Sequence, residues 1–204
     1  DSPRGEEFTR GQIALFRDTA DAVEAVRGPL LKHLANSGAV LGHPDAWFDL
    51  VRPGIMIYGA QPDPEAARTV PLLPALEWRT RVTFTKPVRA GETVGYGRTW
   101  TAARDTWIGT VPVGYGDGYS RLLSNRGRML VNGRSYPIAG RVCMDQTMID
   151  LGPDPDVAVG DDVVLLGRSG AAEVTTAELA ELMGTIPYEV TCLIARRVGR
   201  EFAG

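Results

Sequence analysis

The stretch Met129-Leu130-Val131-Asn132-Gly133-Arg134-Ser135-Tyr136-Pro137-Ile138 carries the clearest structural signal in the sequence. Two runs with strand-forming residues flank an Asn-Gly pair. A type I′ turn needs positive φ angles at both central residues, and asparagine and glycine adopt them most readily. The stretch therefore predicts a β-hairpin that turns at Asn132-Gly133.

Most of the sequence around this hairpin also predicts strands, from about residue 76 onward. Val82 and Phe84 alternate with polar residues, and residues 107–113 read as another strand. Residues 163–166 form a short apolar run of the kind found in buried strands. The second part of the chain is therefore expected to be mainly β.

One helix is expected within this β region. Thr175 with Glu178 fits a capping box, and Gly184 is placed to end the helix that follows. We predict a mainly β domain over residues 61–204, with a proline-containing linker at about 61–75.

The residues before the linker have a different pattern. Gly28-Pro29 ends an opening helix, and residues 32–37 and 48–52 read as two short strands. This order of elements predicts parallel βα architecture for residues 1–60. The helix is predicted from apolar residues at mostly three- and four-residue intervals: Phe8, Ile13, Phe16, Ala20, Val23 and Val26.

The overall composition excludes several classes of protein. A net charge of −3 does not favour binding to nucleic acid or to an anionic membrane. No apolar run reaches membrane-spanning length. The two cysteines are too few for a disulfide scaffold, which favours a reducing cytosol. His33 and His43 lack partners at metal-ligand spacing, so no metal site is expected. Neither a dinucleotide glycine pattern nor a serine nucleophile elbow occurs.

Tyr96 lies between two glycines, in Val94-Gly95-Tyr96-Gly97, and Tyr115, nineteen residues later, also lies between two glycines. Taken alone, each pattern is more typical of a tight turn with a surface aromatic residue. The alternative is that the glycines present a phenol to a ligand at close range.

Two further loops predict an anion site. Arg52-Pro53-Gly54-Ile55 ends the second predicted strand with free N–H groups from Gly54 onward, and Asn36-Ser37-Gly38 ends the first strand with a hydroxyl. Either loop alone is typical of an ordinary βα connection. As a pair after consecutive strands, they favour phosphate binding at the carboxyl edge of a parallel sheet.

Six motifs occur in order along nearly the whole chain: Asn36-Ser37, Val51-Arg52-Pro53-Gly54-Ile55-Met56-Ile57-Tyr58-Gly59, Val94-Gly95-Tyr96-Gly97, Pro112-Val113-Gly114-Tyr115-Gly116-Asp117-Gly118-Tyr119, Gly140-Arg141-Val142-Cys143-Met144-Asp145-Gln146 and Pro187-Tyr188-Glu189. Together these motifs resemble those of the alanine racemase family. The family usually has Ser in place of Gly95 and Ala in place of Gly116.

The resemblance implies a fold class of α/β plus mainly β, in which residues 1–60 are the last βα units of a (β/α)8 barrel and a C-terminal β domain follows. It also implies pyridoxal 5′-phosphate as cofactor, alanine as substrate, D-alanine supply for peptidoglycan as the role, and a head-to-tail homodimer. The implied site residues are Ser37, Gly54, Ile55 and Tyr188 for the phosphate, Arg52 for the pyridine nitrogen, Tyr96 as a catalytic base in the partner's active site, and Met144, Tyr115 and Asp145 at the substrate.

Chemistry supports these implied roles. Racemisation removes a proton from one face of the substrate and returns one to the other, so two bases are needed. Arg52 beside the ring nitrogen would keep that nitrogen unprotonated, because two cations repel. A tyrosine base needs a pKa below its usual value near 10, and Arg52 is the cation that we expect to lower it for Tyr96.

The family also has a lysine that forms a Schiff base with the cofactor, and neither Lys32 nor Lys86 fits that position. We therefore expect the chain to be part of a longer enzyme and to be inactive alone. Two alternatives remain open: a racemase for serine or several small amino acids, and a non-catalytic dimerisation module.

Overall fold

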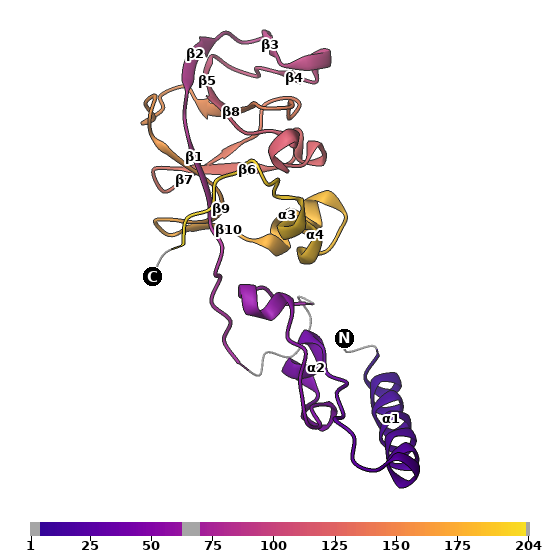
Figure 1. Ribbon diagram of the computed structural model, residues 1–204. Helices are drawn as coiled ribbons and strands as arrows, with labels where there is room; N and C mark the ends of the chain where they lie inside the picture. The colour runs from indigo at the N-terminus through magenta and orange to yellow at the C-terminus, as the bar shows by residue number, and fades with distance from the viewer. Residues whose placement is uncertain (1–4, 63–69, 203–204) are drawn as a thin grey trace. The chain divides into compact units, whose positions relative to one another are not determined.

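The computed structural model describes residues 5–62 and 70–202. The chain divides into two compact units, Asp1–Ala75 and Leu76–Gly204 (Figure 1). Residues 63–69, the centre of the predicted linker, lie outside the described residues. Within the described ranges, no helix is both long and apolar enough to cross a membrane.

The first unit opens with α1, Glu6–Arg27, as the spacing of its apolar residues predicts. The helix ends at Gly28, which has a φ of 85° and donates its N–H to a carbonyl of the last turn. Ile13 is buried in the middle of the helix, whereas Phe8 and Val26 near its ends are exposed. The apolar stripe is therefore only partly covered within this unit.

The two predicted strands of this unit are shorter than expected. Residues 32–37 and 48–52 pair in parallel over a short stretch, with a bridge between His33 and Leu50 and a hydrogen bond from the Arg52 N–H to the Ala35 carbonyl. The chain leaves the extended conformation at the start of α2, Ser37–Gly42, so the pairing cannot continue. Two short 3-10 helices complete the unit: η2, Pro44–Ala46, and η3, Ile55–Tyr58.

The second unit is mainly β, as predicted, and its sheets are antiparallel (Figure 1). The larger sheet has the order β1-β9-β6-β7, with β10 on β9, and the others are β2-β5-β8 and β3-β4. The strands are β1 Trp78–Arg81, β2 Phe84–Val88, β3 Thr93–Val94, β4 Trp100–Thr101, β5 Thr106–Val111, β6 Arg128–Val131, β7 Arg134–Pro137, β8 Thr147–Gly152, β9 Asp162–Ser169 and β10 Ala172–Val174.

The predicted hairpin is β6-β7. Asn132 and Gly133 have φ angles of 51° and 76°, as a type I′ turn requires. Val131 pairs with Arg134 across the turn, so the register follows from the turn. β6 is also hydrogen-bonded to β9, and its apolar side chains lie in the main core of the unit. β6 is therefore an inner strand of the larger sheet, and β7 lies at its edge.

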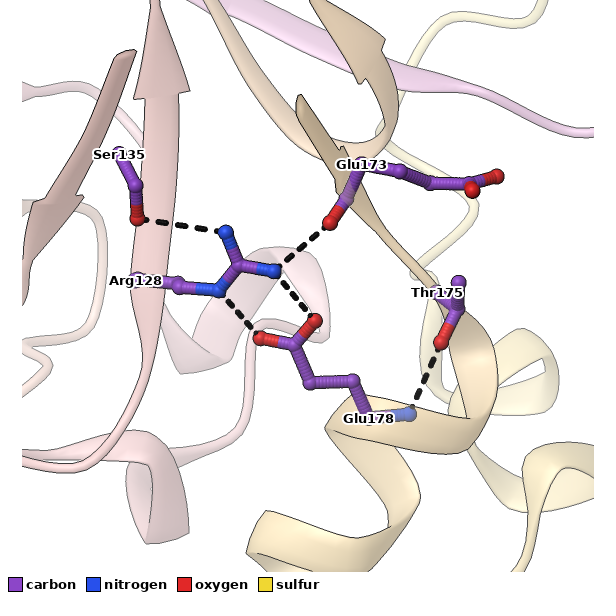
Figure 2. Close-up of polar contacts among 5 residues, drawn as sticks. All are labelled: Arg128, Ser135, Glu173, Thr175 and Glu178. Atoms are coloured by element: carbon purple, nitrogen blue, oxygen red, sulfur yellow. Dashed lines mark hydrogen bonds and ion pairs between the residues drawn. The ribbon is translucent and has the colours of Figure 1, made fainter. Parts of the chain in front are cut away.

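Two helices pack on this unit: the predicted α3, Thr176–Met183, and a second one, α4, Pro187–Leu193. Thr175 caps α3 by accepting the N–H of Glu178, and Gly184 ends it with a φ of 72°. The rest of the expected capping box is not formed, because the Glu178 carboxylate binds Arg128 of β6 instead, at 2.6 and 2.7 Å (Figure 2). Arg128 thereby joins α3 to the sheet.

Candidate active site

Ser37 and Gly54, which the sequence places at a predicted anion site, contact each other in the first unit. The Gly54 N–H donates to Ser37 Oγ at 2.8 Å, and the Met56 N–H reaches the same oxygen at 3.5 Å. Ser37 is only 2% exposed. The two loops meet because the segments before them pair in parallel, with the Arg52 N–H donating to the Ala35 carbonyl at 2.8 Å.

The chemistry of this cluster suits a phosphate group. Its contributors are a hydroxyl and backbone N–H groups, which donate hydrogen bonds to an oxyanion. Ile55 begins η3, so its N–H has no acceptor within that helix. A Cβ built on Gly54 would lie 3.6 Å from Ser37 Oγ, in the space directly beside the hydroxyl. A side chain at this position would therefore lie in van der Waals contact with the hydroxyl.

Arg52 is held by His33, a residue whose role the sequence reasoning missed. Arg52 Nη1 lies 2.6 Å from His33 Nδ1 and 3.3 Å from the His33 carbonyl oxygen. A guanidinium can only donate hydrogen bonds, so His33 Nδ1 must accept and the proton of a neutral imidazole lies on Nε2. The parallel register could have revealed the pair, because Leu50 is opposite His33 and Arg52 is two residues further on.

Tyr96 lies at the tip of the β3-β4 hairpin in the second unit, in the 3-10 turn Tyr96–Arg98. Gly95 and Gly97 have φ angles of 77° and 73°, which side-chain-bearing residues rarely adopt. The phenol is 74% exposed. The glycines thus produce a turn that displays the tyrosine, as the sequence pattern allowed.

Tyr115 and Met144 lie on two loops that are hydrogen-bonded to each other. The Tyr115 N–H donates to the Cys143 carbonyl at 2.9 Å, and the Gly116 N–H donates to the Met144 carbonyl at 2.8 Å. A Cβ on Gly114 would come within 2.2 Å of the Cys143 carbonyl oxygen, so this close contact requires glycine. The Tyr115 and Met144 side chains are both exposed at this junction.

Asp145, Cys143 and Gly116 lie next to this junction. Asp145 is exposed, in a turn that the Cys143 N–H closes by donating to the Gln146 carbonyl at 2.9 Å. Burial, and then the nearby Asp145 carboxylate, raise the pKa of the Cys143 thiol. A Cβ on Gly116 would lie 2.7 Å from Arg197 Nη2 and 2.9 Å from the Met144 carbonyl oxygen, so an alanine here would displace both.

Arg141 connects the Tyr96 turn with the Met144 loop. A Cβ on Gly97 would lie 3.4 Å from Arg141 Nε, so the arginine side chain packs directly against the turn. The second unit therefore brings Tyr96, Tyr115, Met144 and Asp145 onto adjoining loops.

Tyr188 is half-buried in the first turn of α4. It belongs to the second unit, whereas Ser37, Arg52, Gly54 and Ile55 belong to the first. The described residues contain no group of three or more side chains that could hold a metal ion.

Two family models match the chain. The model for the alanine racemase C-terminal domain matches residues 75–202, and the model for the alanine racemase N-terminal domain matches residues 1–62. Among curated proteins, the alanine racemase of Cutibacterium acnes is 54% identical over 205 residues, which cover 100% of this chain and 54% of that protein. The alanine racemase of Halothermothrix orenii is 44% identical, over 98% of this chain and 53% of that protein.

Solved structures give the same result. Alanine racemase from Streptomyces coelicolor superposes with a TM-score of 0.91 at 39% identity, covering 98% of this chain and 53% of that one. Alanine racemase from Bacillus anthracis with bound L-Ala-P gives a TM-score of 0.89 at 37% identity, covering 98% and 52%. The chain spans about half the length of the relatives that it matches. The predicted fold class, barrel units followed by a β domain, is confirmed.

Proposed function

The chain belongs to the alanine racemase family, and on this basis we propose that the protein containing it interconverts L-alanine and D-alanine with pyridoxal 5′-phosphate. We assign residues 1–60 to the cofactor-binding barrel and residues 61–204 to the β domain, with a linker at about 61–75. The relatives' names support alanine as the substrate.

The observation that carries this proposal is the convergence of hydrogen-bond donors at Ser37. Ser37 Oγ with the N–H groups of Gly54 and Ile55 would hold the cofactor phosphate, joined by the Tyr188 hydroxyl. The Gly54 N–H donates to Ser37 Oγ at 2.8 Å, so the hydroxyl lies beside the start of the Gly54-Ile55 turn, which supports this proposal. When bound, pyridoxal phosphate withdraws electrons from the substrate α-carbon and so makes its proton acidic.

Arg52 would face the pyridine nitrogen of the cofactor. The contact between Arg52 Nη1 and His33 Nδ1 at 2.6 Å holds one nitrogen of the guanidinium in place. The other N–H groups of Arg52 remain available to the cofactor. A guanidinium stays protonated, so it donates a hydrogen bond without giving up a proton. Arg52 would thus bind the ring nitrogen while disfavouring its protonation.

Tyr96 would act as one of the two bases that racemisation requires. Its phenol is 74% exposed on a glycine-flanked turn, so it can enter a site that its own unit does not enclose. This exposure supports a head-to-tail homodimer in which Tyr96 reaches the partner's active site. The nearby Met144 N–H would bind the substrate carboxylate, with Tyr115 and Asp145 at the entrance.

Neither lysine of the chain suits the covalent bond to the cofactor. Lys32 Nζ lies 2.8 Å from Asp21 Oδ1 and 2.6 Å from Glu24 Oε2. Hydrogen bonds to these carboxylates raise the pKa of Lys32, so its amine stays protonated and is a poor nucleophile. Lys86 is exposed in β2 of the second unit. We propose that the Schiff-base lysine is not among these 204 residues.

The test is an assay on the protein expressed from its complete reading frame and supplied with pyridoxal phosphate. Loss of optical rotation from L-alanine and from D-alanine, at comparable kcat/KM, is the expected result. A kcat/KM for serine equal to or above that for alanine would favour the broader racemase. Racemisation of neither amino acid would overturn the proposed function in favour of the dimerisation module.

A further inference from the structure

Asn125 joins the turn that carries Tyr96 to the loop that leads to Met144. Its Nδ2 donates to the Thr99 carbonyl at 3.1 Å, and its Oδ1 accepts the Gly140 N–H at 2.7 Å. These partners fix the orientation of the amide, because a carbonyl can only accept and an N–H can only donate. The backbone N–H of Asn125 donates to the Gly140 carbonyl at 3.1 Å, which closes the link.

The two loops that Asn125 connects are those of the candidate site. Thr99 is the residue directly after the Tyr96–Arg98 turn. Gly140 precedes Arg141 and the Met144 loop, and a Cβ on Gly140 would lie 3.0 Å from the Val94 carbonyl oxygen. The loops are therefore in contact, and the Asn125 side chain is hydrogen-bonded to both.

We propose that Asn125 is a positioning residue that holds the Tyr96 phenol at a fixed place relative to the Met144 loop. The inference rests on the proposed function of Tyr96 as a base. Proton transfer requires close alignment of base and substrate, and a displacement of about 1 Å can cost roughly 100-fold in rate. Asn125 touches neither substrate nor cofactor in this account, so its effect is exerted through Tyr96.

The local structure allows a clean variant. Asn125 has a φ of 56°, which glycine adopts without strain, so Asn125→Gly removes the side-chain bonds and leaves the turn intact. Asn125 and Thr99 are exposed, so water can replace their hydrogen bond and the variant should fold. Gly140 is buried, and its N–H loses the Asn125 acceptor in Asn125→Gly. Asn125→Asp is a second variant that keeps the acceptor for Gly140 but has no donor for Thr99.

The chain offers a matched control at Asn132. Its φ is 51°, and its Nδ2 donates to the Asp156 carbonyl at 3.0 Å and to Asp161 Oδ2 at 2.8 Å, in the β6-β7 turn. Asn132→Gly therefore removes a similar exposed amide link from the same unit without touching the Tyr96 turn.

The first readout is amide hydrogen exchange of the protein without cofactor. Asn125→Gly and Asn125→Asp should speed exchange in residues 94–101 and leave β9 unchanged, whereas Asn132→Gly should leave residues 94–101 unchanged. Wild-type exchange in residues 94–101 of both Asn125 variants would overturn the proposal. This readout does not depend on activity, so it holds even if the proposed function fails.

The second readout is exchange of the alanine α-proton with deuterated water by the holoenzyme, measured for each enantiomer. Asn125→Gly should slow exchange of the enantiomer that depends on Tyr96 by roughly 10- to 100-fold and leave the other enantiomer close to wild type. Equal loss for both enantiomers, or no loss, would overturn the positioning role. Absence of exchange by the wild-type holoenzyme would instead count against the proposed function.

Discussion

Arg52 Nη1 lies 2.6 Å from His33 Nδ1, on neighbouring segments that pair in parallel. The histidine accepts this hydrogen bond and so fixes the guanidinium that we assign to the cofactor ring. His33→Ala should therefore weaken the effect of Arg52 and lower kcat/KM roughly 10-fold. His33→Asn, whose Oδ1 lies close to the position of Nδ1 and can accept the same bond, should restore part of the loss. Steady-state kinetics of both variants check this, and equal losses in both would contradict the hydrogen-bond explanation.

Ser37 should bind the phosphate group of the cofactor and no other part of it. Ser37→Ala removes one hydrogen bond to an anion, so the Kd for pyridoxal phosphate should rise roughly 10-fold or more. The Kd for pyridoxal, which lacks the phosphate, should stay near the wild-type value. Titration followed by absorbance compares the two ligands. A parallel loss of affinity for both would show that Ser37 acts on the fold of the loop instead.

The lysines of the chain should remain unmodified when the 204-residue chain meets the cofactor. Lys32 is held as an ammonium by Asp21 and Glu24, and Lys86 lies exposed on a strand. Incubation with pyridoxal phosphate, borohydride reduction and peptide mass spectrometry should find no stoichiometric label on either residue. A full label on Lys32 or Lys86 would refute the assignment of the covalent lysine to another part of the protein.

Tyr119 should make the second unit sensitive to alkali. It is 1% exposed, its hydroxyl has no hydrogen-bond partner among the described residues, and burial, followed by the Glu178 charge, raises its pKa. A raised folded pKa means that the contribution to stability is complete below the unfolded pKa of about 10 and is lost as pH rises beyond it.

Tyr119→Phe removes this titration and an unpaired buried hydroxyl. At pH 7 the free energy of unfolding should change by less than about 1 kcal/mol. Above about pH 10 the variant should be the more stable protein, since it has no phenol to ionise. Urea unfolding at several pH values measures both. Identical alkaline loss in wild type and variant would contradict the assignment to Tyr119.

Local signals predicted several elements well. The Asn-Gly pair at residues 132–133 predicted the β6-β7 hairpin, because few residues other than asparagine and glycine accept its angles. The stripe of apolar residues predicted α1, and Gly28 predicted its end. β8 was not predicted from the sequence, although its residues alternate between buried and half-buried, a periodicity of two that is typical of a strand.

Long-range partners were harder to predict, because local spacing does not show them. Glu178 fitted a capping box with Thr175, yet its carboxylate binds the Arg128 guanidinium, 50 residues away in sequence (Figure 2). A charged partner outcompetes a backbone N–H for a carboxylate. The Asn125 contacts with Thr99 and Gly140 likewise join residues 26 and 15 positions apart. His33 was considered only as a metal ligand, whereas the parallel register pairs it with Arg52.

The role of Tyr96 cannot be tested by comparing kcat/KM in the two directions. L-alanine and D-alanine have equal free energies, so kcat/KM must be equal in both directions for any variant. A variant that lacks one base can still exchange the α-proton of the enantiomer served by the other base. Exchange therefore separates the two bases where steady-state rates do not.

The most direct measurement is α-proton exchange in deuterated water by the Tyr96→Phe holoenzyme, followed by NMR for each alanine enantiomer separately. The account predicts that racemisation is lost, that one enantiomer no longer exchanges its α-proton, and that the other still does. Exchange of both enantiomers at wild-type rates, or small and equal losses for both, would remove Tyr96 from the role of base.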